Sequence, residues 1–345
     1  MKGAPRIVFI ADAGPMVGGG HVLRCLTLAS ALTMAGAVCG FVAAPPAAAM
    51  LDVFAGPAIE RLAVAGGPPA DLAAQAALAA SRWAADVAVI DHYGFGSDQE
   101  GVVRAAVSRV LALDDLCRAH ACDLVLDSNL GRTATDYPGT PAMTGVEYAL
   151  VRPEFAALRA STLRRRGGHP ALRRILVSLG LTDVQGITAR VARALGAVSG
   201  DAAVDIVVGG GAPSLPALRE MARADSRIAL HVDTQEMAAL MSAADLAIGA
   251  GGSSVWERSC LGLPTVLVVL AENQRPNAQA LAAAGAVVVV EANDPDFEFR
   301  LGAAVAGLAA SPDQRRRLGR AAAGLCDGLG AARVADQVLN LAAVS

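Results

Sequence analysis

Three glycines followed by a histidine form the first candidate site in this sequence. The run Gly18-Gly19-Gly20-His21 lies in a loop, residues 14–25, that comes directly after a short apolar segment. Glycines let a backbone approach a ligand closely, and the helix expected after them points its positive end at the loop. That positive end disfavours a charged imidazole, so the neutral form, a competent general base, should prevail. The position fits a histidine that only caps the helix equally well.

A second loop, residues 249–257, combines glycines with serines after another apolar run. Backbone N–H groups and serine hydroxyls in such a turn suit the oxygens of a diphosphate. Glu257 lies one turn further along, within reach of a ribose diol. Ser254 and Glu257 also match a capping box, which needs no ligand. Both interpretations hold together if the cap shapes the pocket.

Amides and one aromatic side chain mark three further loops. Asn273 and Gln274 follow an apolar run, and amides both donate to and accept from sugar hydroxyls and acetamido groups. An ordinary turn explains them as well. Residues 178–183 form either a phosphate loop or a simple helix start. In residues 91–94, Tyr93 either faces a ligand or packs at the end of a strand.

Several common catalytic and metal-binding motifs are absent from the sequence. It has no GxxxxGK[ST], HExxH or GxSxG motif and no DxD pair. Asp114 and Asp115 are adjacent, and adjacent residues of a strand point to opposite faces, so we interpret them as structural. We therefore expect neither a metal nor a cofactor.

Alternating strands and helices must position these loops. Such alternation builds right-handed parallel βαβ units, in which ligands bind beyond the carboxyl ends of the strands. Strands are expected at residues 6–13, 37–43, 61–65, 87–91, 110–113, 124–127, 148–151, 175–179, 204–208, 228–231, 246–248, 265–269 and 287–290. Helices are expected at residues 21–34, 69–83, 97–107, 184–198, 215–223, 234–242, 254–261, 297–308 and 313–326.

The pattern restarts once, which predicts two domains. At 345 residues the chain exceeds the size at which one core usually stops growing. The basic segment 164–173, which contains glycines and a proline, is the expected linker. We predict an α/β fold of two Rossmann-like, doubly wound domains facing across a cleft. Residues 1–165 would carry the histidine loop and residues 174–345 the phosphate loop, with the last helix able to pack back on the first domain.

Charge, hydropathy and cysteine content exclude several classes of protein. A net charge of −3 argues against a nucleic-acid partner. The uncharged stretch 25–51 contains two glycines and a Pro-Pro pair, so we expect no stable membrane insertion. Six cysteines without a CxxC motif are expected as free thiols in a reducing cytoplasm, and the N-terminus is too weakly apolar for a signal peptide. We expect a cytoplasmic monomer or weak dimer.

Four segments taken together resemble a known family. They are Gly19-Gly20-His21-Val22-Leu23-Arg24-Cys25 and the ranges 112–115, 148–155 and 249–274, which occur in this order. The chain resembles the PseG family, UDP-2,4-diacetamido-2,4,6-trideoxy-β-L-altropyranose hydrolases of pseudaminic acid biosynthesis with the GT-B fold, related to the MurG glycosyltransferase. The resemblance implies a cytoplasmic enzyme whose sialic-acid-like product decorates flagellin or a surface polysaccharide.

The resemblance also implies a role for each loop. His21 would orient or deprotonate the water that attacks the anomeric carbon, without a metal, releasing UDP and the free sugar with inversion at C1. Tyr93 and Asn273 match the family's other active-site positions. Glu257 would hold the ribose, and the backbone near Val232 the uracil edge. The other expected contacts to the UDP-sugar are Gly19, Gly20, Arg24, Gly180, Thr182, Gly251, Gly252, Ser253, Ser254 and Gln274.

One position departs from the family, and other functions stay open. The family usually has Gly-Gly-Thr-Asp where this chain reads Gly180-Leu181-Thr182-Asp183, and a leucine cannot approach a ligand as closely as glycine. The main alternative is a GT-B glycosyltransferase that uses a UDP-amino-sugar donor. A hydrolysing UDP-N-acetylglucosamine 2-epimerase would need acidic catalytic residues that the sequence does not match. A binding module without activity would not need His21, Tyr93 and Asn273 together.

Overall fold

The chain divides into two compact units, which are described here one at a time. The computed structural model describes residues 3–14, 17–168, 171–196 and 198–343. Unit 1 comprises Met1–Leu150 and Leu329–Ser345, and unit 2 comprises Val151–Gly328. Pro15 and Met16 of the histidine loop, and His169 and Pro170 of the expected linker, lie outside the described residues.

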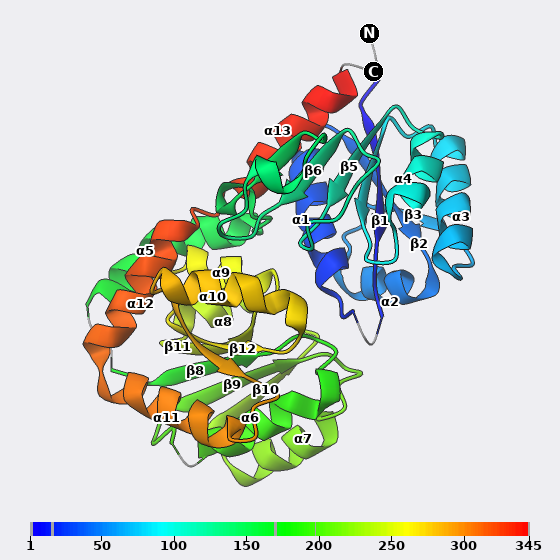
Figure 1. The fold of residues 1–345 in the computed structure, drawn as a ribbon. Coiled ribbons are helices and arrows are strands. Elements are labelled where there is room, and N and C mark those ends of the chain that lie inside the picture. Colours follow the sequence, from blue (N-terminus) through cyan, green and yellow to red (C-terminus); the bar gives the residue numbers. More distant parts are fainter. Residues whose placement is uncertain (1–2, 15–16, 169–170, 197, 344–345) are drawn as a thin grey trace. The chain divides into compact units, whose positions relative to one another are not determined.

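Unit 1 is built on a seven-stranded parallel sheet (Figure 1). Its strand order is β3-β2-β1-β4-β5-β6-β7, the doubly wound pattern in which the first strand lies centrally. The strands are β1 (Arg6–Ala11), β2 (Val38–Ala43), β3 (Glu60–Ala63), β4 (Val87–Asp91), β5 (Arg109–Leu113), β6 (Leu124–Asp127) and β7 (Ala142–Thr144). The helices are α1 (Gly20–Met34), α2 (Pro45–Phe54), α3 (Pro69–Arg82), α4 (Ser97–Arg104) and α13 (Gly330–Ala343).

Apolar side chains cover both faces of this sheet because its strands are nearly continuous apolar runs. Ile7 and Phe9 of β1 belong to one buried cluster, with residues of α1 and α13, whereas Val8 and Ile10 belong to another, with residues of α3. Alternate residues of a strand point to opposite faces, so a single strand feeds both clusters. The central position of β1 fixes the place where the histidine loop begins.

The C-terminal helix α13 is part of unit 1, although it follows unit 2 in the sequence. Val334 and Val338 are fully buried in the same cluster as Ile7. The helix begins at Gly330, where an added Cβ would lie 2.3 Å from the carbonyl oxygen of Ala149. Only glycine fits this close backbone contact.

Unit 2 repeats the architecture with a six-stranded parallel sheet of order β10-β9-β8-β11-β12-β13 (Figure 1). Its strands are β8 (Arg174–Ser178), β9 (Ala203–Val208), β10 (Ile228–Val232), β11 (Leu246–Ala250), β12 (Thr265–Val269) and β13 (Val287–Glu291). Its helices are α5 (Pro153–Gly167), α6 (Ile187–Gly196), α7 (Leu215–Ala224), α8 (Met237–Ala243), α9 (Ser254–Cys260), α10 (Arg275–Ala283), α11 (Phe297–Ala310) and α12 (Pro312–Leu325). Both units are thus doubly wound α/β structures.

The segment between the two sheets differs from the sequence-based expectation. Most of the expected linker's arginines end helix α5, which belongs to unit 2, so the boundary lies near residue 150 rather than at 165–174. Arg165 donates to the carbonyls of Ser242 and Ala244, and Arg166 donates to those of Met241 and Leu261. The run is therefore anchored to unit 2 rather than a solvated hinge.

Further differences concern single elements, among them α13, since no helix was expected after residue 326. The strand predicted at 148–151 is wrong, because a 3₁₀ turn, Val146–Tyr148, ends there and β7 (Ala142–Thr144) closes the sheet instead. Helix α2 (Pro45–Phe54) was not expected, although a proline pair at its start is a typical helix opening. In the part of the chain that the structure describes, no helix has both the length and the apolar character needed to cross a bilayer.

Candidate functional site

His21 lies in the first turn of α1, where the sequence analysis placed it, and a carboxylate holds its ring. Its Nδ1 is 2.7 Å from Oδ1 of Asp91 and 3.1 Å from the Asp91 carbonyl oxygen. Asp91 ends β4, which pairs with β1, the strand that leads into the histidine loop. A neutral ring that donates from Nδ1 carries its lone pair on Nε2. The arrangement therefore leaves Nε2 as the basic nitrogen.

Asp91 is the central charged group of unit 1, with no exposed surface. Arg24 donates to both of its carboxylate oxygens, Nε to Oδ2 at 2.6 Å and Nη2 to Oδ1 at 2.5 Å. Burial disfavours the ionised carboxyl, but Arg24 and His21 outweigh it and hold the pKa of Asp91 well below its ordinary value. Asp91 is therefore a fixed negative charge behind the imidazole.

Tyr93 stands beside His21 and links it to a second carboxylate. The two rings meet edge to face with their centroids 4.5 Å apart. The Tyr93 hydroxyl donates to Oδ2 of Asp115 at 2.9 Å, and the same oxygen lies 3.6 Å from Nη1 of Arg24. Burial and the nearby Asp115 charge raise the pKa of Tyr93 well above its ordinary value, so the phenol stays protonated. His21, Arg24, Asp91, Tyr93 and Asp115 form one cluster, called here the histidine cluster.

The sequence analysis did not identify two carboxylates of this cluster as functional. Asp91 was noted only as the start of a loop, yet an acidic residue that ends an otherwise apolar strand is a usable signal. Asp115 was interpreted as structural together with Asp114. The two have separate partners: Asp114 accepts from Arg118 at 2.7 Å and from Tyr137 at 3.0 Å, whereas Asp115 reaches Tyr93.

The expected Arg24 contact to substrate has a different setting in the structure. Its guanidinium donates to Asp91 from two nitrogens and is near Asp115, so its charge is already balanced inside the protein. Gly19 and Gly20 lie directly before His21, Gly19 as the N-cap residue of α1 and Gly20 as its first residue. Their contact to a substrate stays a prediction.

In unit 2, residues 249–254 run from the last two residues of β11 through the turn 251–253 to the first residue of α9, and we call this segment the glycine–serine loop. The side chain of Gln274 fastens it: Oε1 accepts from the N–H of Gly251 at 3.3 Å and from that of Leu270 at 3.1 Å. An added Cβ at Gly251 would lie 3.1 Å from Cβ of Gln274, so the loop and the 3₁₀ turn Glu272–Gln274 are closely packed. Asn273 lies in that same turn. Gly251, Asn273 and Gln274 are thus brought together.

The capping box considered for Ser254 and Glu257 is not formed. Ser253 occupies the N-cap of α9 without a side-chain cap bond, and Ser254 Oγ accepts instead from Nη1 of Arg258 at 3.0 Å. Glu257 pairs with Nε of Arg152 at 2.9 Å. Burial raises the pKa of the Glu257 carboxyl, and Arg152 opposes that rise. One oxygen of Glu257 is thus already engaged by a cation.

The remaining predicted contacts are spread along the same carboxyl edge of unit 2. Val232 ends β10 and is 37% exposed. Gly180 has φ +107, a conformation that favours glycine, and precedes Thr182. The carboxylate of Asp183, at the end of this loop, accepts from the N–H groups of Thr188 at 2.8 Å and Ser214 at 2.9 Å, which fixes the end of the loop to the residues around α6 and α7.

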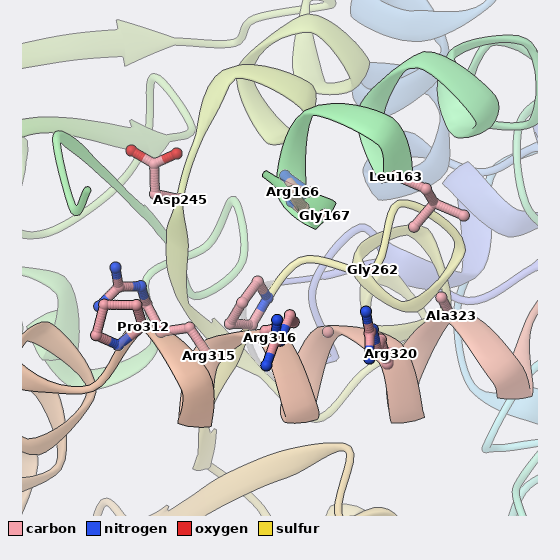
Figure 2. A pocket seen from close by; sticks show the side chains of 12 residues that line it. Leu163, Arg166, Gly167, Asp245, Gly262, Pro312, Arg315, Arg316, Arg320 and Ala323 are labelled. Carbon is pink, nitrogen blue, oxygen red and sulfur yellow. The ribbon is translucent and has the colours of Figure 1, made fainter. Parts of the chain in front are cut away.

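A cavity of about 300 Å³ in unit 2 contains none of the predicted site residues (Figure 2). It lies beside Asp245 and Pro264, which precede β11 and β12. It therefore opens at the amino edge of the sheet, whereas the glycine–serine loop follows the carboxyl end of β11. Ligands of doubly wound sheets bind at carboxyl edges, so we do not assign the predicted site to this cavity.

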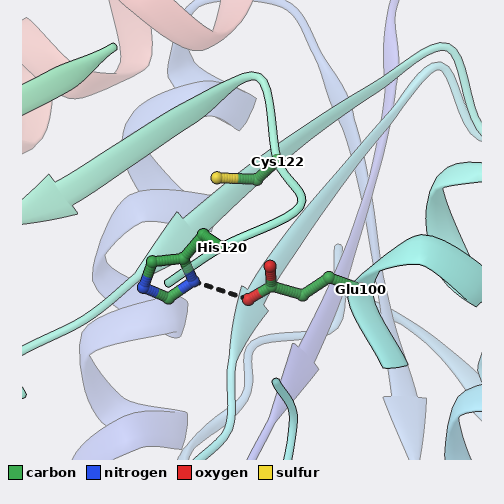
Figure 3. A group of neighbouring side chains, drawn as sticks. All are labelled: Glu100, His120 and Cys122. Atoms are coloured by element: carbon green, nitrogen blue, oxygen red, sulfur yellow. Dashed lines mark hydrogen bonds and ion pairs between the residues drawn. The ribbon is translucent and has the colours of Figure 1, made fainter. Parts of the chain in front are cut away.

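Glu100, His120 and Cys122 form a group whose ligand-type atoms lie within 4.8 Å of one another (Figure 3). His120 Nδ1 is 2.7 Å from Oε1 of Glu100, and Nε2 is 3.7 Å from Oδ2 of Asp114. Burial raises the pKa of the Cys122 thiol to about 12, which keeps it protonated and a poor ligand. We interpret the group as a buried ion pair with an adjacent thiol.

This ion pair predicts a stability loss in alkali. Burial lowers the pKa of His120, but the neighbouring carboxylates of Asp114 and Glu100 outweigh it and raise the pKa to about 9. A raised folded-state pKa gives a stabilisation that is complete below the unfolded value, about 6.5, and lost as pH rises through 9. Urea midpoints at pH 6, 7.5 and 9 should fall more steeply for the wild type than for His120→Gln. Equal slopes would contradict this ion pair.

Comparison with known proteins agrees with this architecture. Residues 206–337 match the family described as "Glycosyltransferase family 28 C-terminal domain". A UDP-2,4-diacetamido-2,4,6-trideoxy-beta-L-altropyranose hydrolase of Campylobacter jejuni is 24% identical over 286 residues, 81% of this chain and 97% of the relative. The resemblance to the PseG family is thereby confirmed over most of the chain.

Solved structures show the same fold at lower identity. MurG of Acinetobacter baumannii is 18% identical, with a TM-score of 0.65 over 97% of this chain and 99% of that one. An S. aureus MnaA–UDP structure is 13% identical, with a TM-score of 0.64 over 98% and 97% of the two chains. The expected GT-B fold, with two Rossmann-like units, is confirmed.

Proposed function

We propose, for a PseG-like chain with the GT-B fold, that it hydrolyses a UDP-linked 2,4-diacetamido-2,4,6-trideoxyhexose to UDP and the free sugar. The comparisons support an enzyme of nucleotide-sugar processing. The name of the Campylobacter relative supports the L-altropyranose as the sugar, and the resemblance to the PseG family supports pseudaminic acid biosynthesis as the pathway. The observation that carries hydrolysis is the carboxylate-held imidazole of His21.

The histidine cluster is suited to activating water. Nε2 of His21 takes a proton from a water molecule, whose oxygen attacks C1 of the sugar from the face opposite UDP. The C1–O bond breaks, its electron pair leaves with the diphosphate, and the anomeric centre inverts. Asp91 stabilises the imidazolium formed in this step, because its negative charge is fixed by Arg24 and lies 2.7 Å from Nδ1. Tyr93 keeps the ring in place from the side.

The loops of unit 2 are suited to the nucleotide. In this proposal the glycine–serine loop binds the diphosphate, Glu257 the ribose and the backbone near Val232 the uracil. The similarity of the fold to that of MnaA, whose structure contains UDP, supports a UDP site in a chain of this fold. Asn273 and Gln274 lie against the glycine–serine loop and would contact the sugar next to the diphosphate.

A glycosyltransferase is the second candidate, favoured by the family 28 domain and the likeness to MurG. The two functions differ in the acceptor. Pure protein incubated with UDP-2,4-diacetamido-2,4,6-trideoxy-β-L-altropyranose and EDTA should release UDP and free sugar in equal amounts, without an acceptor. Proton NMR of the first product should show the inverted anomer. UDP release only after an acceptor is added would support the transferase and contradict hydrolysis.

A further inference from the structure

Arg258 lies buried under the glycine–serine loop, and the sequence analysis did not consider it. It is on α9 and only 1% exposed. Nη2 donates to the carbonyl of Ala250 at 2.6 Å, and Nη1 donates to Ser254 Oγ at 3.0 Å. An added Cβ at Gly249 would lie 2.5 Å from Cζ of Arg258, so the guanidinium is packed directly against the loop backbone.

The positive charge of Arg258 has no carboxylate at ion-pair distance among the described residues. Glu257, its neighbour in sequence, pairs with Arg152 instead. Nε of Arg258 is buried and makes no hydrogen bond to any residue that the structure describes. Burial lowers the pKa of Arg258 to about 10, and Glu257 only partly offsets this. A buried charge without a counter-ion is costly, and Arg24 shows one solution in this chain, a buried carboxylate.

The loop that covers Arg258 is open to solvent on part of its surface. Gly252 is exposed, and an added Cβ there would meet no atom within 4 Å. In sequence, Gly252 lies between Ala250 and Ser254, the two residues of the loop to which the guanidinium donates. The charge of Arg258 is buried, and charges interact more strongly in poorly hydrated surroundings than in water.

We propose that Arg258 positions the diphosphate of the nucleotide sugar, by supplying the counter-charge beneath the glycine–serine loop and by holding the loop through Ala250 and Ser254. The proposal rests on the proposed function, because the anion it requires is the diphosphate of UDP. The uracil and ribose do not need this charge. Replacing Arg258 should therefore lower the affinity for UDP and leave the affinity for uridine almost unchanged.

The test is the ratio of the affinities for UDP and uridine, measured by calorimetry on the full chain. Arg258→Gln keeps an amide donor but removes the charge. It should lower the affinity for UDP about 10- to 50-fold, while the affinity for uridine changes less than about threefold. Arg258→Lys keeps the charge and should retain most of the ratio. A charge-independent, structural role would lower both affinities together in both variants.

Arg166→Gln is the matched control. Arg166 also donates to backbone carbonyls in unit 2, those of Met241 and Leu261, but it lines the cavity at the amino edge of the sheet (Figure 2). Its loss should lower the stability of the fold and leave the affinity ratio unchanged.

If Arg258→Gln does not fold, Gly249→Ala tests the role of Arg258 in its place, because the added methyl group would displace the guanidinium without removing the charge. The UDP affinity alone should fall in that variant.

The outcomes separate this inference from the proposed function. An unchanged ratio in Arg258→Gln, or in Gly249→Ala where the first does not fold, would overturn the role of Arg258 while hydrolysis by the wild type stands. A wild type that binds neither UDP nor uridine would overturn the proposed function and this inference with it. A wild type that binds UDP no more tightly than uridine would overturn the diphosphate site, and the role of Arg258 with it.

Discussion

Replacing His21 with alanine should lower the turnover of the UDP-sugar by about 10²- to 10⁴-fold, the usual contribution of a positioned general base. The affinity for UDP should change little, because the proposed UDP contacts are in unit 2. His21→Asn should be equally slow, since an amide fills the space but cannot accept the proton of water. Single-turnover assays, with UDP affinity measured in parallel, check both variants.

His120→Asn is the control for His21. It also removes a buried histidine of unit 1 that is paired with a carboxylate, 2.7 Å away in each case. We expect it to lower the urea midpoint but to leave turnover per folded molecule near that of the wild type. Full turnover in both His21 variants would disprove the mechanism, even with the family resemblance intact.

Asp91→Asn should reduce turnover by about 10²- to 10⁴-fold as well, although Asp91 itself does not transfer a proton. An amide can donate to Nδ1 of His21, which moves the ring proton to Nε2 and leaves no base there. It also removes the negative charge that stabilises the imidazolium. The same change leaves Arg24 without its buried counter-ion, which should cost about 3–5 kcal/mol of folding free energy.

The double variant His21→Ala/Asp91→Asn tests whether Asp91 acts on turnover through His21. If Asp91 acts through His21, the double variant should turn over no more slowly than His21→Ala alone, because residues that act as a unit are not additive. Asp127→Asn is the control: Asp127 is equally buried and accepts from Tyr137 at 2.9 Å, outside the histidine cluster. It should lower stability without lowering turnover. Independent, multiplying losses at His21 and Asp91 would refute their coupling.

Part of this protein could be predicted from local sequence, because local patterns fix local structure. Alternating apolar runs and helical periodicity predicted the strands of both sheets except β7, and the glycines before His21 predicted the start of α1. The arginines at 164–166 misled the prediction, since a run of positive charges gives no sign of the carbonyls that it contacts. The pattern at 148–151 favoured a strand, but the sheet is completed by β7.

The sequence alone determined two doubly wound halves and the loops at their carboxyl edges, since both follow from periods of a few residues. The tertiary structure alone decided which charges meet. Asp91 and His21 are 70 positions apart and pair because β4 lies next to β1. Glu257 does not pair with Arg258, its neighbour in sequence, but with Arg152, which is 105 positions away from Glu257. Burial and strand order are properties of the whole chain, so no local pattern could reveal these pairs.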